Sequence, residues 1–183
     1  MERPPIDGPR ATMRGWRSIC QVMRADFSRR GEMGDKAAYD EELLGVVREF
    51  VDEARDAMDD VEPRLLDLER QWEDGGGLAT EIVNSIFRLF HSIKGNASAL
   101  DFNNVAHMTH AAESLVDLFR RGVTPSRASI SLLCRVVDRL RKLIAYISSE
   151  LNDTFEVDQT EALAKEIEVV IGTLSLPQTA AAP

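Results

Sequence analysis

Apolar residues recur every three or four positions through most of this chain, which is the spacing of amphipathic helices. The clearest run starts at Ile130 and ends at Leu151, with Leu133, Val137, Leu140, Ile144 and Ile147 between them. Five such segments predict helices, at residues 39–72, 79–100, 104–121, 125–151 and 158–174. No segment alternates with a period of two, so we expect no strands.

Polar and small residues mark the ends of these segments. The residues expected to cap helix starts are Asn103, Thr124 followed by Pro125, and Asp158 paired with Glu161. Basic residues followed by a glycine are expected to stop the third helix, at Arg120, Arg121 and Gly122. Pro63 removes one backbone donor inside the first helix, so we expect a kink or a restart there.

Short turns between long helices force neighbouring helices to run antiparallel. We therefore expect an all-α fold, an antiparallel up-and-down four-helix bundle with an additional C-terminal helix, over residues 38–175. Residues 1–37 are expected to be a disordered tail, with a short amphipathic helix between Trp16 and Phe27 as the alternative. The Ala/Pro-rich residues 176–183 are interpreted as a flexible tail or the start of a linker.

The net charge, the length of the apolar runs and the cysteines limit the classes of protein to which this chain can belong. A formal net charge of −9 argues against nucleic acid as the main partner. No run of about 18 apolar residues is present, so we expect no membrane insertion, and the N-terminus lacks a signal-peptide core. Cys20 and Cys134 lie far apart without a CxxC motif, as expected for reduced thiols in a cytoplasmic protein. We expect the domain to be monomeric.

The second predicted helix carries a candidate nucleophile. Its expected buried face consists of Ile82, Ile86, Leu89, Ile93, Ala97 and Leu100. His91 and Gly95 fall on the opposite face, so the imidazole points away from the core beside a residue without a side chain. Glycine within a helix costs about 1 kcal/mol relative to alanine, which suggests that a phosphoryl group or a partner uses this space. Lys94 reaches the same side, where its ammonium would offset negative charge.

The third predicted helix carries a partner for this histidine. His110 and Glu113 are three residues apart and share a face. In antiparallel helices joined by a tight turn, they lie level with His91 at a rise of about 1.5 Å per residue. Glu113 can then accept a hydrogen bond from the Nδ1–H of His91, which leaves the Nε2 lone pair outward as a nucleophile. His110 either extends this polar network or is simply an exposed histidine.

Two other interpretations of these residues stay open. Histidines and lysines on the polar face of a helix are usually solvated side chains, and neither His91 nor Lys94 indicates a function by itself. His91, His110 and Glu113 also make an alternative three-ligand zinc set. Against a metal site, the chain has no HExxH motif and no second carboxylate–histidine repeat of the kind that a di-iron bundle needs. A glycine-rich phosphate loop for nucleotide binding is absent as well.

Residues 87–95 (FRLFHSIKG) resemble the phosphorylated helix of histidine-containing phosphotransfer (HPt) domains. Residues 109–115 (THAAESL) resemble in particular the N-terminal HPt domain of CheA-type chemotaxis histidine kinases. The resemblance spans about residues 38–175, and its most specific part is HxxKG followed by HxxE. One departure is the segment 96–102, which lacks the further glycines often found after the HxxKG core.

The resemblance implies a role for each candidate residue. His91 is the residue that is phosphorylated, Lys94 compensates charge, Gly95 allows close approach, His110 is accessory and Glu113 orients His91. The implied function is phosphorelay signal transduction. A phosphoryl group is received from a histidine kinase or a phosphorylated receiver and is passed to an aspartate of a response regulator.

On this interpretation the domain is a phosphoryl carrier and not an enzyme on its own. Its implied partners are a histidine kinase catalytic domain and a response-regulator receiver domain. It needs no cofactor of its own, because the partner supplies Mg²⁺. No kinase domain follows in the sequence, so we expect either a stand-alone phosphotransfer protein or the phosphoacceptor part of a longer kinase. The alternative function is a helical adaptor that binds a kinase or a receiver without being phosphorylated.

Overall fold

The computed structural model describes residues 41–73 and 80–175 of the chain. Within these ranges all regular structure is helical, which confirms the predicted all-α fold class. The helices are α2 (Glu41–Glu73), α3 (Thr80–Ala99), α4 (Asn103–Arg120), α5 (Arg127–Glu150) and α6 (Val157–Ser175). In this part of the chain no helix is long and apolar enough to cross a membrane.

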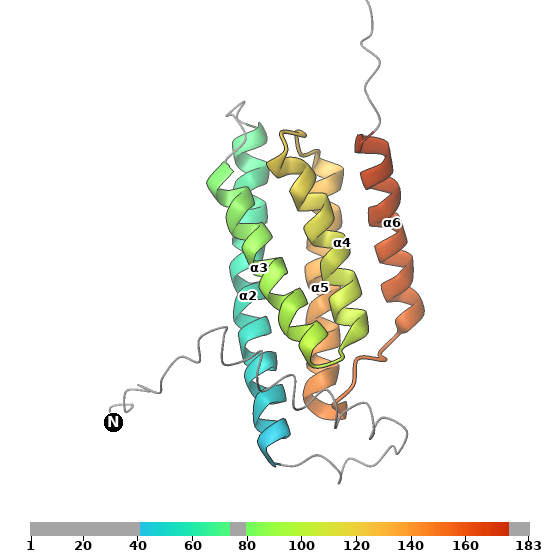
Figure 1. The fold of residues 1–183 in the computed structure, drawn as a ribbon. Helices are drawn as coiled ribbons and strands as arrows, with labels where there is room; N and C mark the ends of the chain where they lie inside the picture. Colours follow the sequence, from blue (N-terminus) through green and yellow to red (C-terminus); the bar gives the residue numbers. More distant parts are fainter. Residues whose placement is uncertain (1–40, 74–79, 176–183) are drawn as a thin grey trace, which may run out of the picture.

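Four of the helices form an antiparallel bundle. In Figure 1, α2 and α4 run in one direction and α3 and α5 run in the other. Helix α2 packs against α3 and α5, and α4 packs against the same two helices, which closes the four-helix arrangement. Helix α6 packs mainly on α4 and only lightly on α5. The predicted four-helix bundle with an additional C-terminal helix is therefore confirmed.

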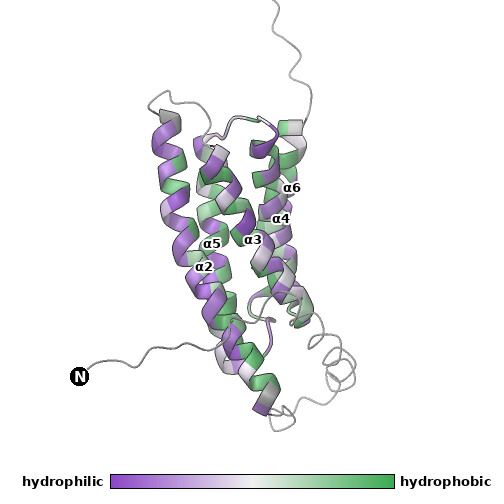
Figure 2. Cartoon of the chain, turned by 60° about the vertical axis from the view of Figure 1, so that its left-hand side comes forward, coloured by the Kyte–Doolittle hydropathy of each residue, from purple (hydrophilic) through white to green (hydrophobic). Residues whose placement is uncertain are grey.

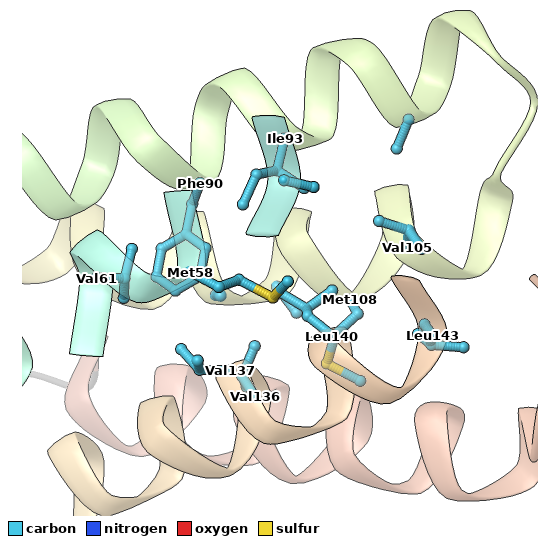
Figure 3. Packing of buried hydrophobic residues seen from close by; sticks show 14 of the residues in the cluster. Met58, Val61, Phe90, Ile93, Val105, Met108, Val136, Val137, Leu140 and Leu143 are labelled. Atoms are coloured by element: carbon cyan, nitrogen blue, oxygen red, sulfur yellow. The ribbon is translucent and has the colours of Figure 1, made fainter. Parts of the chain in front are cut away.

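The core forms where the four helices face one another. Met58 of α2, Phe90 of α3, Met108 of α4 and Leu140 of α5 are fully buried and lie close together in Figure 3. Hydrophobic and hydrophilic residues alternate along the ribbons in Figure 2, as expected of helices that each carry an apolar stripe. Burial of these apolar stripes, more than helix propensity, holds the elements in place.

The buried face of α3 agrees with the predicted one at Ile86, Ile93, Ala97 and the following Leu100, but it is shifted by one residue at two positions. Val83 and Phe90 are fully buried, whereas Ile82 and Leu89 are only partly buried. Val83 and Phe90 each follow another apolar residue, Ile82 and Leu89, so the helical spacing alone fits either member of each pair. Contacts with α2 and α4 on two sides of α3 select the stripe that contains Phe90. His91 stays on the exposed side in either case.

Helix α2 continues through Pro63, so of the two alternatives expected there, a kink or a restart, the restart is wrong. Met58 and Val61 before the proline and Leu65 after it are all fully buried, which holds both halves of the helix against the core. Pro63 itself is exposed. The carbonyl group that loses its helical partner therefore lies on the solvent side, where water can replace the missing hydrogen bond.

The N-terminus of α4 is capped by a residue from a distant loop. The helix begins at Asn103, so this residue is not the cap that the sequence predicts, and the preceding Phe102 makes no side-chain capping bond. The buried carboxylate of Asp153 accepts hydrogen bonds from the backbone N–H groups of Asn104 (2.6 Å) and Val105 (3.1 Å). This negative group satisfies two free donors at the positive end of the helix. It thereby anchors the helix that carries Glu113.

Helix α5 starts two residues later than predicted, so Thr124 is not its cap and Pro125 is not its first residue. Ser126 occupies the cap position. Its hydroxyl accepts a hydrogen bond from the backbone N–H of Ser129 (3.1 Å), whose own hydroxyl accepts one from the N–H of Ser126 (2.8 Å). This reciprocal pair is a capping box with serine in place of the usual glutamate.

A buried arginine ties the segment before α6 to α5. Arg139 is 5% exposed and donates hydrogen bonds to the carbonyl of Phe155 (2.8 Å), to Oε2 of Glu156 (2.6 Å) and to Oγ1 of Thr160 (2.9 Å). Helix α6 begins one residue before Asp158, so that residue lies in its first turn and the predicted capping box at this position is wrong.

Several expectations concern residues outside the described ranges. These are the tails at 1–37 and 176–183, the alternative helix between Trp16 and Phe27, and the state of Cys20. Cys134 is described, and it is a free thiol that is partly buried against the core. Burial raises the pKa of this thiol, and the carboxylates of Glu62, Glu69 and Asp138 raise it further. A thiol in this setting stays protonated, which agrees with a role in packing.

Candidate functional site

His91 lies in the middle of α3 with its side chain 58% exposed. Its neighbours Phe90 and Ile93 point into the core and are almost completely buried. Because residues 90 and 93 hold this turn of the helix against the bundle, the backbone of His91 sits on a rigid element while its ring reaches solvent. The structure therefore places the candidate nucleophile as the polar stripe of α3 predicts.

Glu113 of α4 meets His91 across the interface between the two helices. Nδ1 of His91 lies 2.8 Å from Oε1 of Glu113, whose side chain is only 10% exposed. Because a carboxylate can only accept, this bond requires the proton to be on Nδ1. The neutral imidazole then keeps its lone pair on Nε2. The antiparallel register of α3 and α4 thus brings together the two side chains that the sequence pairs.

Lys94 pairs with the other oxygen of the same carboxylate. Its ammonium forms an ion pair with Oε2 of Glu113, and the Lys94 side chain is 26% exposed. Burial alone would raise the pKa of Glu113, but Lys94 and then His91 outweigh it and hold this pKa below its ordinary value of 4.5. Glu113 is therefore an anion at neutral pH, and it connects the imidazole to the ammonium group.

Replacement of Glu113 by glutamine should make the stability of the domain less sensitive to acid. The pKa of Glu113 is lower in the folded protein than its ordinary value of 4.5, so the unfolded chain binds this proton more tightly. The stabilisation is present above that ordinary value and is lost as the pH falls through the lower, folded-state pKa. Denaturant unfolding at pH values from about 7 to about 3 should show that the free energy of unfolding falls more steeply in wild type than in Glu113→Gln. A difference in the free energy of unfolding that is the same at every pH would contradict this prediction.

The two remaining predicted site residues are both exposed. A Cβ atom added at Gly95 would meet nothing within 4 Å, so the packing of the chain itself does not require a glycine there. The imidazole of His110 makes no hydrogen bond to His91 or Glu113 in the described part of the chain, although its helix position is on their side. The structure thus joins His91, Glu113 and Lys94 directly and leaves His110 beside them.

The alternative zinc set is not assembled. In residues 41–73 and 80–175, no three histidine, cysteine, aspartate or glutamate side chains form a group that could hold a metal ion. Nδ1 of His91 and both oxygens of Glu113 are engaged with each other and with Lys94.

Sequence reasoning missed an aromatic and cationic contact beside the histidine. The ring of Phe87 stacks on that of His91, with centroids 6.0 Å apart and planes 13° from parallel. The guanidinium carbon of Arg120 lies 4.1 Å from the centroid of Phe87. One signal was available, because Phe87 is one helical turn before His91 and Arg120 is two turns after Glu113. The local pattern around Arg120 indicates only a helix stop.

Comparisons with known proteins match this chain to one domain family. A family model described as the Hpt domain matches residues 45–150. The chemotaxis protein CheA of Salmonella typhimurium is 38% identical over 106 residues, which cover 57% of this chain and 15% of that protein. The sensor histidine kinase CheAY of Helicobacter pylori is 27% identical over 135 residues, which cover 71% of this chain and 16% of that protein. The chain therefore spans only about a sixth of the length of these relatives.

A solved structure resembles the fold as well. It is the crystal structure of the phosphorylated P1 domain of CheA3 in complex with CheY6 from R. sphaeroides. The similarity has a TM-score of 0.65 with 27% sequence identity, and it covers 72% of this chain and 99% of that one.

Proposed function

This chain belongs to the Hpt domain family, and on that premise we propose that it is a phosphorelay intermediate. It accepts a phosphoryl group on Nε2 of His91 and passes it to an aspartate of a response-regulator receiver domain. The observation that carries this proposal is the bond from His91 Nδ1 to the buried carboxylate of Glu113 (2.8 Å). That bond selects the tautomer with a free lone pair on Nε2, in a side chain that is 58% exposed.

In the first step, the Nε2 lone pair of His91 attacks phosphorus. The N–P bond forms while the bond from phosphorus to the leaving oxygen of the donor breaks, and that oxygen takes the electron pair. The ring becomes a cation, which Glu113 stabilises through Nδ1–H. In the second step a receiver aspartate oxygen attacks phosphorus, the N–P bond breaks and its electrons return to Nε2. Mg²⁺ for these steps comes with the partner protein.

Lys94 supplies charge compensation to the transferred group. A phosphoryl group brings about −2 charge to the site. The ammonium of Lys94 sits on the neighbouring carboxylate oxygen of Glu113, one turn of helix from the imidazole. Its flexible stem allows it to share its donors between Glu113 and a phosphoryl oxygen.

We propose that a receiver domain is the acceptor because the related P1 domain of CheA3 is bound to CheY6 in its crystal structure. A histidine kinase catalytic domain is the proposed donor, on the basis of the CheA relatives. The domain itself acts as the carrier and leaves catalysis to these partners. The open surface at Gly95, one turn after His91, gives a partner backbone room to approach.

Gly95→Ala should stabilise the domain and slow transfer. The added methyl group meets nothing in the free protein, so the better helix propensity of alanine should raise the free energy of unfolding by about 1 kcal/mol. Against a docked receiver the same methyl group should clash and slow transfer about tenfold. Denaturant unfolding and transfer rates measure the two effects.

Gly172→Ala in α6 is the matched control, because Gly172 is also an exposed helical glycine with nothing within 4 Å of an added Cβ. Gly172→Ala should raise the free energy of unfolding without changing the rate of phosphoryl transfer. Transfer at the wild-type rate in Gly95→Ala would show that the partner does not use this space.

The experiment that tests the function is a two-stage transfer. The domain is labelled by a CheA-type kinase core with radioactive ATP, separated from the kinase, and mixed with a receiver domain and Mg²⁺. We expect the label to leave the domain and appear on the receiver. A folded domain that takes no label from the kinase or from a phosphorylated receiver, yet binds the receiver, would contradict the proposal and favour the adaptor.

A further inference from the structure

One hydrogen bond does not determine the orientation of the His91 ring. Within the described residues, its imidazole makes a single hydrogen bond, to Glu113. The torsion that rotates a histidine ring about its Cβ–Cγ bond is broad, and this ring is 58% exposed. The Nε2 lone pair lies in the ring plane, so a rocking ring points that lone pair away from an in-line approach to phosphorus. A second restraint on the ring plane would favour productive geometry.

Phe87 is placed to give that restraint. Its ring lies nearly parallel to the imidazole, at 13°, with a centroid distance of 6.0 Å. Phe87 is itself only partly buried, at the edge of the core. Core packing therefore does not fix its ring in the way that it fixes the fully buried Phe90.

Arg120 holds the Phe87 ring from α4. Its guanidinium carbon is 4.1 Å from the ring centroid, which is the geometry of a cation–π contact. The guanidinium is held in turn by two bonds, from Nε to Oδ1 of Asn84 (2.9 Å) and from Nη1 to Oδ1 of Asp117 (3.2 Å). These anchors lie on the two helices that carry His91 and Glu113. The contact therefore connects the site across the same interface.

We infer that Arg120 is a positioning residue for phosphoryl transfer. It acts through Phe87, which it holds flat against His91 so that the imidazole plane directs Nε2 at the partner. This inference rests on the proposed function, because it assigns a role in that same reaction. Arg120 does not itself contact the phosphoryl group.

A simpler explanation is that Arg120 attracts an acidic partner by its charge. Arg121 separates the two explanations, since it is the next residue, carries the same charge, is 73% exposed and also pairs with Asp117. It makes no described contact with Phe87. If charge attraction is the role, Arg120→Ala and Arg121→Ala should both weaken binding of the partner. If positioning is the role, only Arg120→Ala should slow phosphoryl transfer within the bound complex.

The test measures transfer from the phosphorylated domain to a receiver in single turnover, as a function of receiver concentration. Arg120→Ala should lower the rate at saturating receiver about three- to tenfold while half-saturation stays unchanged. Arg121→Ala should keep the wild-type saturating rate. Phe87→Leu should match Arg120→Ala, and the double variant should be no slower than Phe87→Leu alone, because Arg120 acts through that ring. Arg120→Lys should recover part of the rate.

NMR of the unphosphorylated domain supplies a readout that does not depend on transfer. The stacked Phe87 ring shifts the ring-proton resonances of His91, and Arg120→Ala should move them toward their positions in Phe87→Leu. Unmoved resonances, a wild-type saturating rate in Arg120→Ala, or equal weakening of half-saturation in both arginine variants would each overturn the inference. If the wild-type domain takes up no phosphoryl label at all, that result would contradict both the proposed function and this inference.

Discussion

His91→Gln should take up no phosphoryl group while keeping its helical fold. An amide nitrogen has no available lone pair with which to attack phosphorus, so no stable N–P bond can form. The amide can still donate a hydrogen bond to Glu113 in the position of the Nδ1–H. The His91 side chain is 58% exposed, so the substitution removes no core packing. We expect labelling to fall by more than about a thousandfold, to background.

The chain contains three histidines, which supplies matched controls for this experiment. His107 and His110 are both exposed on α4. His107→Gln and His110→Gln should both be labelled by the same kinase core, and circular dichroism should be unchanged in all three variants. Labelling of His91→Gln at the wild-type level would remove His91 as the acceptor.

Glu113→Ala should slow phosphorylation about 10- to 100-fold without abolishing it. The variant keeps the nucleophilic ring but loses the acceptor that selects its tautomer and stabilises its cation. It also leaves the ammonium of Lys94 without the carboxylate that it pairs with. The initial rate of label uptake at a fixed kinase concentration measures the effect.

Glu113→Gln separates orientation from charge. Its amide oxygen can still accept from Nδ1–H, so the ring is held but the cation is not neutralised. We expect the rate for glutamine to lie between those for alanine and wild type. A rate for Glu113→Ala equal to wild type, in a variant shown to be folded by its thermal melt, would show that the orienting bond is unimportant.

Periodicity and antiparallel pairing are enough to predict the central pair of the site. The apolar spacing places five helices correctly, and the short turn between α3 and α4 sets their register. Residues equally far from a turn lie side by side in such a pair, so the sequence alone matches His91 with Glu113. The 2.8 Å bond between them follows from that geometry.

The pairing of Lys94 with Glu113 is not predicted by the sequence. The sequence pattern places Glu113 on a polar stripe, where a solvated carboxylate needs no cation. The pattern therefore indicates for Lys94 only that it compensates the charge of a phosphoryl group. The Glu113 side chain is in fact only 10% exposed, and a buried anion requires a nearby cation. Burial depends on how two helices pack, which periodicity does not determine for residues at the edge of a stripe.

The anchors of the bundle could not be predicted for a different reason. Asp153 caps α4 from a loop almost fifty residues away in the chain, and Arg139 binds the segment at 155–160. The sequence shows local capping candidates such as Asn103. A cap supplied by a tertiary contact leaves no local pattern, so the sequence does not indicate it. The position of α6 depends on such contacts.

The measurement that tests the central claim most directly is the location of the phosphoryl group on the labelled wild-type domain. ³¹P and ¹⁵N NMR of protein phosphorylated by a CheA-type kinase core identifies both the residue and the ring nitrogen. We predict a single N–P bond, at Nε2 of His91, with Nδ1 still protonated and bound to Glu113. A phosphoryl group on Nδ1, on His107 or His110, or on any other residue would contradict that claim.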